Sequence, residues 1–309
     1  MNDNIPLSNK ISTASSWPYL RISWAVAIVV LSLLLQESLR MAIRLGMGKN
    51  ESVLVSLILG LILPASIIVV RLSPHPKETL RLKGLSARSA CWVAGASLCF
   101  TLLATSLIEM LLRMGRLPPG IETLLEKEEQ LLREFFSFQG ARDQFTVALA
   151  VVVVAPIAEE LLFRGLLQGS LEKRLGNWAG LAITALAFGF LHGRLRLMPV
   201  TLLGILMGYA VMRTNSLFAG IVAHTVNNAL AMALAFFVKV EFLSFDFLSW
   251  GVGLGIWGLA VFLWLLRRST THIARISKMT RRPNQYDAPA QQGLGGPVRN
   301  HGRGWEEET

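Results

Sequence analysis

The chain has 309 residues, of which 52% are hydrophobic and 16% are charged, and its mean hydropathy is +0.49. A soluble domain carries about a quarter charged residues, so this composition excludes an ordinary soluble protein and predicts a polytopic membrane protein. The net charge of +10 does not indicate nucleic-acid binding, because the basic residues fall mainly in short loops and the C-terminal tail, as cytoplasmic segments of membrane proteins do.

The predicted fold class is all-α, a bundle of about eight transmembrane helices. Apolar runs predict spans near residues 20–36, 52–70, 89–112, 145–167, 178–193, 197–212, 216–238 and 250–266. Between the third and fourth spans, residues 120–138 mix leucine and phenylalanine with many charges. This segment is expected to form an amphipathic helix, either lying on the membrane surface or capping the bundle in water.

The distribution of Lys and Arg predicts the orientation. The loop after the second span holds five basic residues and one Glu, and residues 267–282 hold six basic residues and no acidic one. Both segments should therefore be cytoplasmic, and with an even number of spans both termini are cytoplasmic. Arg194 and Arg196, on the predicted outer side, depart from this pattern.

Two carboxylates and a guanidinium, from Glu159, Glu160 and Arg164, follow the apolar run 145–158. A span starting at Phe145 needs roughly 20 residues to cross, so these groups are expected still to lie at membrane depth. Ionisable groups there cost about 2.5–3.5 kcal/mol each and by default mark a functional site. The alternative is that the span ends at Ala158 and the glutamates face water.

Helical spacing separates the roles of the two glutamates. Glu160 and Arg164 lie four residues apart and can pair along the helix, whereas Glu159 is rotated by about 100° and is left free. Pro156 removes a helix hydrogen bond, so it is expected to kink the span, free the carbonyl of Val152 and admit water. An incidental kink is the alternative.

Of five histidines, only His192 and His224 lie inside apolar spans. Phe188 shares a helix face with His192, and Asn228 shares one with His224. Alone, each His could bind a neighbouring carbonyl, and Asn227 or Asn228 could hold helices together. Together with the glutamates, they predict that three helices bring proton-handling and hydrogen-bonding groups to one place inside the bundle.

This set of groups suits peptide-bond hydrolysis without a protein nucleophile. A carboxylate can act as general base on water, an imidazole can hold that water, and a second His with an Asn amide can donate to an oxyanion. All four Asp residues lie outside the spans, and neither His-Glu-x-x-His nor Gly-x-Ser-x-Gly occurs. No cofactor is favoured, although zinc held by Glu159, His192 and His224 stays open.

Three motifs carry a resemblance to a known family. They are Glu-Glu-x-x-x-Arg at 159–164, Phe-x-x-x-His at 188–192 and His-x-x-x-Asn at 224–228. In this order on successive membrane helices they resemble the motifs of the CPBP family of intramembrane glutamic endopeptidases, the type II CAAX prenyl protease and bacteriocin-processing family. The resemblance covers about residues 145–238.

The resemblance implies roles for the motif residues. Glu159 would activate water, with His192 helping to position it, and His224 and Asn228 would form the oxyanion hole. The residues that would support the site are Glu160, Arg164 and Phe188. Family members have been called metalloproteases, but the glutamate-activated water is the mechanism that we favour.

The sequence and the resemblance also predict a function and partners. The expected substrate is a peptide or membrane protein, prenylated or not, and CAAX-type processing and bacteriocin or peptide maturation both stay open. The lipid bilayer is the other expected partner, and the protein should be a multi-pass integral membrane protein. Two alternatives are a proton-coupled transporter, with the glutamates and histidines as a relay, and a catalytically silent scaffold.

The expected domain organisation has five parts. They are a polar N-terminal tail (1–17), N-terminal membrane helices with the amphipathic helix (18–144), a catalytic core (145–238), the last membrane helix (239–266), and a basic, then disordered, C-terminal tail (267–309).

Overall fold

The computed structural model describes residues 20–115, 120, 123–124, 127, 130, 140–193, 195–237 and 244–280. The predicted tail 1–17, most of the amphipathic segment 120–138, and the last residues 283–309 lie outside the described residues, as does Arg194. The chain divides into two compact units, Met1–Thr271 and His272–Thr309, and the arrangement described below is that of the first.

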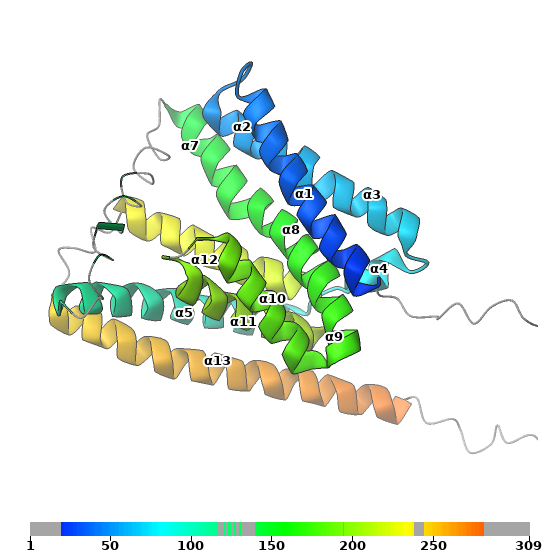
Figure 1. The fold of residues 1–309 in the computed structure, drawn as a ribbon. Helices are drawn as coiled ribbons and strands as arrows, with labels where there is room; N and C mark the ends of the chain where they lie inside the picture. The colour runs from blue at the N-terminus through cyan, green and yellow to red at the C-terminus, as the bar shows by residue number, and fades with distance from the viewer. Residues whose placement is uncertain are drawn as a thin grey trace, which may run out of the picture. The chain divides into compact units, whose positions relative to one another are not determined.

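All regular secondary structure in the described residues is helical (Figure 1). The α-helices before the fourth span are α1 (Ile22–Ile43), α2 (Lys49–Ser56), α3 (Leu63–Leu72), α4 (Pro76–Thr79) and α5 (Ala87–Arg113). Those that follow are α7 (Ala141–Ala148), α8 (Ala155–Glu160), α9 (Gly169–Leu175), α10 (Asn177–Leu191), α11 (Leu197–Thr214), α12 (Leu217–Phe237) and α13 (Phe245–Thr280). Three π-helical segments join some of them: η1 (Leu57–Ile62), η2 (Leu149–Val154) and η3 (Leu161–Gln168).

Seven helical stretches in the described residues are long and apolar enough to cross a membrane. They are Ile22–Ile43, Lys49–Leu72, Ala87–Arg113, Ala141–Leu175, Leu197–Thr214, Leu217–Leu234 and Phe245–Thr270. The remaining expected span, 178–193, corresponds to α10, an apolar helix of 15 residues that is too short for this set. The predicted all-α polytopic bundle is confirmed.

The fourth span is one helix of 35 residues, Ala141–Leu175, and it carries Glu159 and Glu160 near its middle. It consists of α7, η2, α8, η3 and α9 in unbroken succession. The helix therefore does not end at Ala158 and Glu160 is not left in water, whereas the depth of Glu159 in the membrane stays a prediction. Glu160 and the whole of η3 are buried, because α12, α10 and α11 pack against this half of the span.

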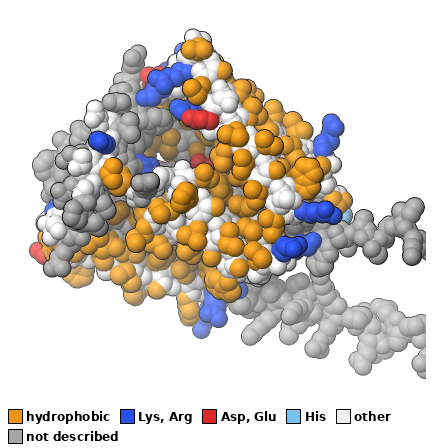
Figure 2. Space-filling model, viewed as in Figure 1, with side chains coloured by type: hydrophobic (Ala, Val, Ile, Leu, Met, Phe, Trp, Pro, Cys, Tyr) orange, Lys and Arg blue, Asp and Glu red, His pale blue; other side chains and the backbone are white. Residues whose placement is uncertain are grey.

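The outer surface of the bundle is apolar. Leu31, Val70 and Trp257 are each at least 60% exposed, and Figure 2 shows hydrophobic side chains covering much of the visible face. A soluble protein rarely exposes so large a contiguous apolar area, whereas lipid tails accept it. This surface fits the predicted lipid bilayer.

Hydrogen bonds connect the segments that follow several of the spans, on one side of the bundle. In the segment between α3 and α5, the carbonyls of Arg81 and Lys83 accept hydrogen bonds from Leu217 N (2.9 Å) and Ser216 Oγ (2.6 Å). The buried Arg81 side chain pairs with Glu172 of α9. The turn between α11 and α12 and the end of α9 therefore lie on the same side as the segment after α3.

Candidate active site

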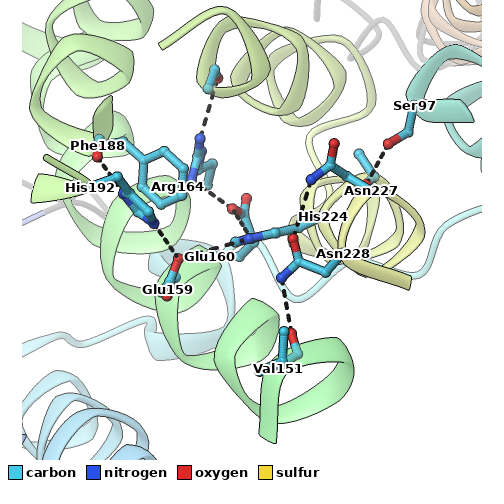
Figure 3. Close-up of polar contacts among 12 residues, drawn as sticks. Ser97, Val151, Glu159, Glu160, Arg164, Phe188, His192, His224, Asn227 and Asn228 are labelled. Carbon is cyan, nitrogen blue, oxygen red and sulfur yellow. Dashed lines mark hydrogen bonds and ion pairs between the residues drawn. The ribbon is translucent and has the colours of Figure 1, made fainter. Parts of the chain in front are cut away.

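Glu159 lies on α8 with its side chain 22% exposed, and it faces both intramembrane histidines (Figure 3). Its Oε2 atom lies 3.7 Å from His192 Nε2 and 3.8 Å from His224 Nε2. This oxygen accepts no hydrogen bond from any residue that the structure describes. The separations are too long for direct hydrogen bonds, and Oε2 is itself buried.

His192 follows the last residue of α10, and its ring is held by Phe188. Nδ1 lies 2.7 Å from the Phe188 carbonyl oxygen, and the two rings are 4.5 Å apart at their centroids. A carbonyl only accepts hydrogen bonds, so Nδ1 carries the hydrogen. In the neutral imidazole, Nε2 is then an acceptor directed toward Glu159, which suits it to receive a hydrogen from water.

His224 on α12 is held by Glu160. Its Nδ1 lies 3.3 Å from Glu160 Oε1, and the side chain is 5% exposed. An ionised carboxylate accepts only, so Nδ1 donates to it. Nε2 can then donate to an oxyanion only when the ring is an imidazolium, which makes the predicted oxyanion role of His224 dependent on a second proton.

Glu160 and Arg164 form the expected pair, and both side chains are fully buried. Arg164 Nη1 donates to Glu160 Oε1 at 2.6 Å, and Nη2 donates to the Gly204 carbonyl of α11 at 3.3 Å. The guanidinium carbon lies 4.3 Å from the centroid of the Phe188 ring. This ion pair thus holds two rings of the site in place, because Glu160 contacts the His224 imidazole and Arg164 packs on the Phe188 ring.

A close approach of α12 makes this burial tight. A Cβ placed on Gly220 would overlap Oε2 of Glu160 and would lie 3.0 Å from Cγ2 of Val211. Only glycine lets α12 come this near to α8, which brings His224, one turn further along α12, within reach of Glu160.

Asn228 binds the backbone of the fourth span. Its Nδ2 donates to the Val151 carbonyl at 2.9 Å, and its Oδ1 accepts from Asn227 Nδ2 at 3.2 Å. In η2 the hydrogen bonds run five residues back, as from Ala155 N to the Ala150 carbonyl. The next donor in this register would be Pro156, which has no N–H, so the Val151 carbonyl is left for Asn228.

The expectation that Pro156 frees the Val152 carbonyl stays a prediction. The count of four back from Pro156 assumes an α-helix, whereas the backbone before it is π-helical. The carbonyl that takes a side-chain donor is that of Val151.

A cavity of about 440 Å³ joins these groups. The predicted catalytic residues Glu159, His192, His224 and Asn228 all line it, together with Phe188. The other described lining residues are Val151, Ala155, Arg196, Val200, Leu203, Asn227, Ala231 and Met232. The structure thus brings the predicted set together around one space, with Glu160 and Arg164 buried behind it, while their catalytic roles stay predictions.

The candidate zinc ligands do not form a metal site in this arrangement. Among the described residues, no group of three or more His, Cys, Asp or Glu side chains is placed to hold a metal ion. In a tetrahedral zinc site with bonds near 2.0–2.1 Å, ligand atoms lie about 3.4 Å apart. The 3.7 and 3.8 Å separations around Glu159 Oε2 are wider, so these side chains as placed do not match the spacing of zinc ligands.

A buried polar row continues from the site along the fourth span. Glu160, Arg164, Gln168 and Glu172 follow one another at intervals of four and are all buried. Gln168 Nε2 donates to Glu172 Oε1 at 2.6 Å and to the Gly208 carbonyl at 3.0 Å. Gln168 and Glu172 are not expected at the site from the sequence, although their spacing from Arg164 is a signal for them.

Residues 141–230 match the family model of the type II CAAX prenyl endopeptidases, Rce1-like. No curated protein and no solved structure matches the chain. The matched segment begins with α7 and ends within α12, so it contains all seven predicted site residues. With its seven candidate spans, the chain is an integral membrane protein whose residues 141–230 match the Rce1-like type II CAAX prenyl endopeptidases.

Proposed function

We propose that this protein is an intramembrane endopeptidase that hydrolyses peptide bonds with a water molecule activated by Glu159. The observation that carries the proposal is the placement of Glu159 Oε2 at 3.7 and 3.8 Å from two imidazole Nε2 atoms in one cavity. A carboxylate oxygen that accepts no hydrogen bond from the described residues and an acceptor imidazole beside it can together hold one water by both of its O–H groups.

The proposed reaction begins when Glu159 takes one proton from this water. His192 Nε2 meanwhile accepts a hydrogen bond from the other O–H group of the water and so holds it in place. The water oxygen forms a bond to the scissile carbonyl carbon, and the carbonyl electron pair becomes the oxyanion. Asn228 uses one amide hydrogen on Val151 and has a second to offer to this oxyanion. Glu159 then returns its proton to the nitrogen as the carbon–nitrogen bond breaks.

We propose prenylated CAAX-type peptides as the first substrate class to test, because the matched family is described by that activity. Purified protein in detergent is expected to cleave a farnesylated CAAX peptide, and cleavage should survive a strong metal chelator. Loss of cleavage on chelation, restored by added zinc, would contradict the metal-independent mechanism.

The same assay separates the other functions. An unprenylated peptide of the same sequence tests whether the lipid is needed, and bacteriocin-type precursor peptides test the maturation function. Proton-coupled uptake into proteoliposomes without cleavage of any of these peptides would support the transporter function and contradict the protease function. Neither uptake nor cleavage would favour the silent scaffold.

We also propose that both termini are cytoplasmic, which requires the short helix α10 to cross together with α11 so that the number of crossings is even. The positive-inside pattern assigns the segment after α3 and the turn between α11 and α12 to the cytoplasm, and these two are hydrogen-bonded to each other. In a variant without Cys91 and Cys99, a cysteine at exposed Lys77 should react with an impermeant maleimide from the cytoplasmic side only. A cysteine at Leu45, in the α1–α2 turn, should react from the other side, and the reverse pattern would contradict the orientation.

A further inference from the structure

Thr101 of α5 lies outside the matched domain, yet it is connected to the candidate oxyanion donor. Thr101 Oγ1 donates to Asn227 Oδ1 at 2.9 Å, and Asn227 Nδ2 donates to Asn228 Oδ1 at 3.2 Å. Asn228 Nδ2 in turn donates to the Val151 carbonyl at 2.9 Å. Three hydrogen bonds thus join α5, α12 and η2 in one chain that ends at the cavity.

The direction of this chain follows from its ends. The Val151 carbonyl is an acceptor only, so Asn228 must turn Nδ2 toward it and Oδ1 toward Asn227. Asn227 must then offer Nδ2 to Asn228 and Oδ1 to Thr101. Rotating either amide by 180° would bring two oxygens face to face at 2.9 or 3.2 Å. One orientation of both amides satisfies every contact.

The hydroxyl of Thr101 completes this orientation. It also lies 2.9 Å from the carbonyl of Ser97, which is four residues back on α5 and has its own helical N–H donor. Asn227 Oδ1 has no other donor among the described residues, so the single hydroxyl hydrogen stabilises the network most when it points to Asn227. Thr101 is 4% exposed, so water does not readily replace it.

We propose that Thr101 is a positioning residue for hydrolysis, acting through Asn227 to keep the Asn228 amide turned with its donor toward Val151 and the cavity. The inference rests on the proposed protease function and extends its machinery to the third membrane span. Asn228 is the group that would contact the oxyanion, whereas Thr101 and Asn227 act only by orienting it.

Thr101→Val keeps the shape of the side chain and removes the hydroxyl. It is expected to lower kcat about tenfold with KM within about twofold, because partners that orient a reacting group typically contribute 10- to 100-fold. Thr101→Ser should restore kcat to within about twofold of wild type. A kcat for Thr101→Val equal to that of wild type would overturn the proposal.

Ser97→Ala is the matched control. Ser97 is fully buried on the same helix and donates to the Ala223 carbonyl of α12 at 2.6 Å, so its loss also removes a buried hydroxyl between α5 and α12. It takes no part in the chain to Asn228, and its kcat should stay within about twofold of wild type. If Ser97→Ala lowered kcat as much as Thr101→Val, the effect would be one of helix packing and the positioning role would fail.

A second measurement does not depend on activity. In protein labelled with ¹⁵N-asparagine, the Asn228 side-chain signals are identified by their absence in Asn228→Asp. Thr101→Val should shift these signals and speed their hydrogen exchange, while Ser97→Ala should not; unchanged Asn228 signals in Thr101→Val would overturn the proposal. If Thr101→Val changed the Asn228 signals but the wild-type protein cleaved no peptide, the hydrogen-bond network would stand and the proposed protease function would fail.

Discussion

Glu159→Gln is expected to lower kcat/KM for peptide cleavage by about a thousandfold while leaving the fold intact. Glutamine has the same shape but cannot take a proton from water, and general-base catalysis typically contributes 10²- to 10⁴-fold. The Glu159 carboxylate is partly exposed to the cavity and its Oε2 accepts no hydrogen bond from the described residues, so the substitution breaks few contacts. Steady-state kinetics and thermal unfolding in the same detergent measure the two effects.

Glu109→Gln is the matched control for this experiment. Glu109 also lies on a membrane helix, and it pairs with Arg113 one turn on, with Nε–Oε1 at 2.7 Å. The same change of charge at this position should leave kcat/KM within about twofold of wild type. A Glu159→Gln enzyme that kept more than a tenth of wild-type activity would remove Glu159 as the base.

The helical character of the fold could be predicted because apolar length is the dominant signal in a membrane protein. Apolar length does not set helix ends, however. The fourth span continues through Glu160 and Arg164 to Leu175, because α10, α11 and α12 bury those charges rather than leaving them to lipid or water. Conversely, α10 ends at Leu191, because the backbone turns after it, and Gly193 has a φ of +89°.

Much of the site could also be predicted, since spacing by four determines which side chains meet on one helix. It identified the Glu160–Arg164 pair and the contact between Phe188 and His192. Contacts between helices are not encoded in spacing. Thr101 is one of several hydroxyl residues in its span, and nothing in the sequence distinguishes it before α12 is seen to lie against α5.

The π-helical backbone is the other feature that spacing could not give. An α-helical count points only to Val152, whereas the wider turn of η2 leaves the Val151 carbonyl for Asn228. The resulting contact links Pro156, a backbone feature of the fourth span, to the orientation of the Asn228 side chain on α12. From the sequence alone, an incidental kink is the alternative interpretation of this proline. Its contact through the Val151 carbonyl instead connects it to the lining of the cavity.

Arg164→Met is expected to give the largest loss of stability, about 3–5 kcal/mol in the free energy of unfolding. Methionine fills much of the same volume but leaves Glu160 buried, charged and without its cation, while the contacts to Gly204 and the Phe188 ring are also lost. Reversible unfolding in mixed detergent measures the change. A loss below about 1 kcal/mol would contradict the inference that removing the guanidinium leaves an uncompensated buried charge at Glu160.

Two further variants identify the cause of that loss. Arg113→Met breaks a pair of the same spacing whose side chains are 27% and 22% exposed, and it should cost less than about 1 kcal/mol. The double variant Glu160→Gln/Arg164→Met removes the stranded charge and should recover part of the stability, because the largest penalty is the uncompensated carboxylate. It should not recover activity, since His224 then faces a neutral amide in place of the carboxylate that holds its Nδ1 hydrogen. Recovered stability without recovered activity would separate the role of the pair in folding from its role in holding His224 at the cavity.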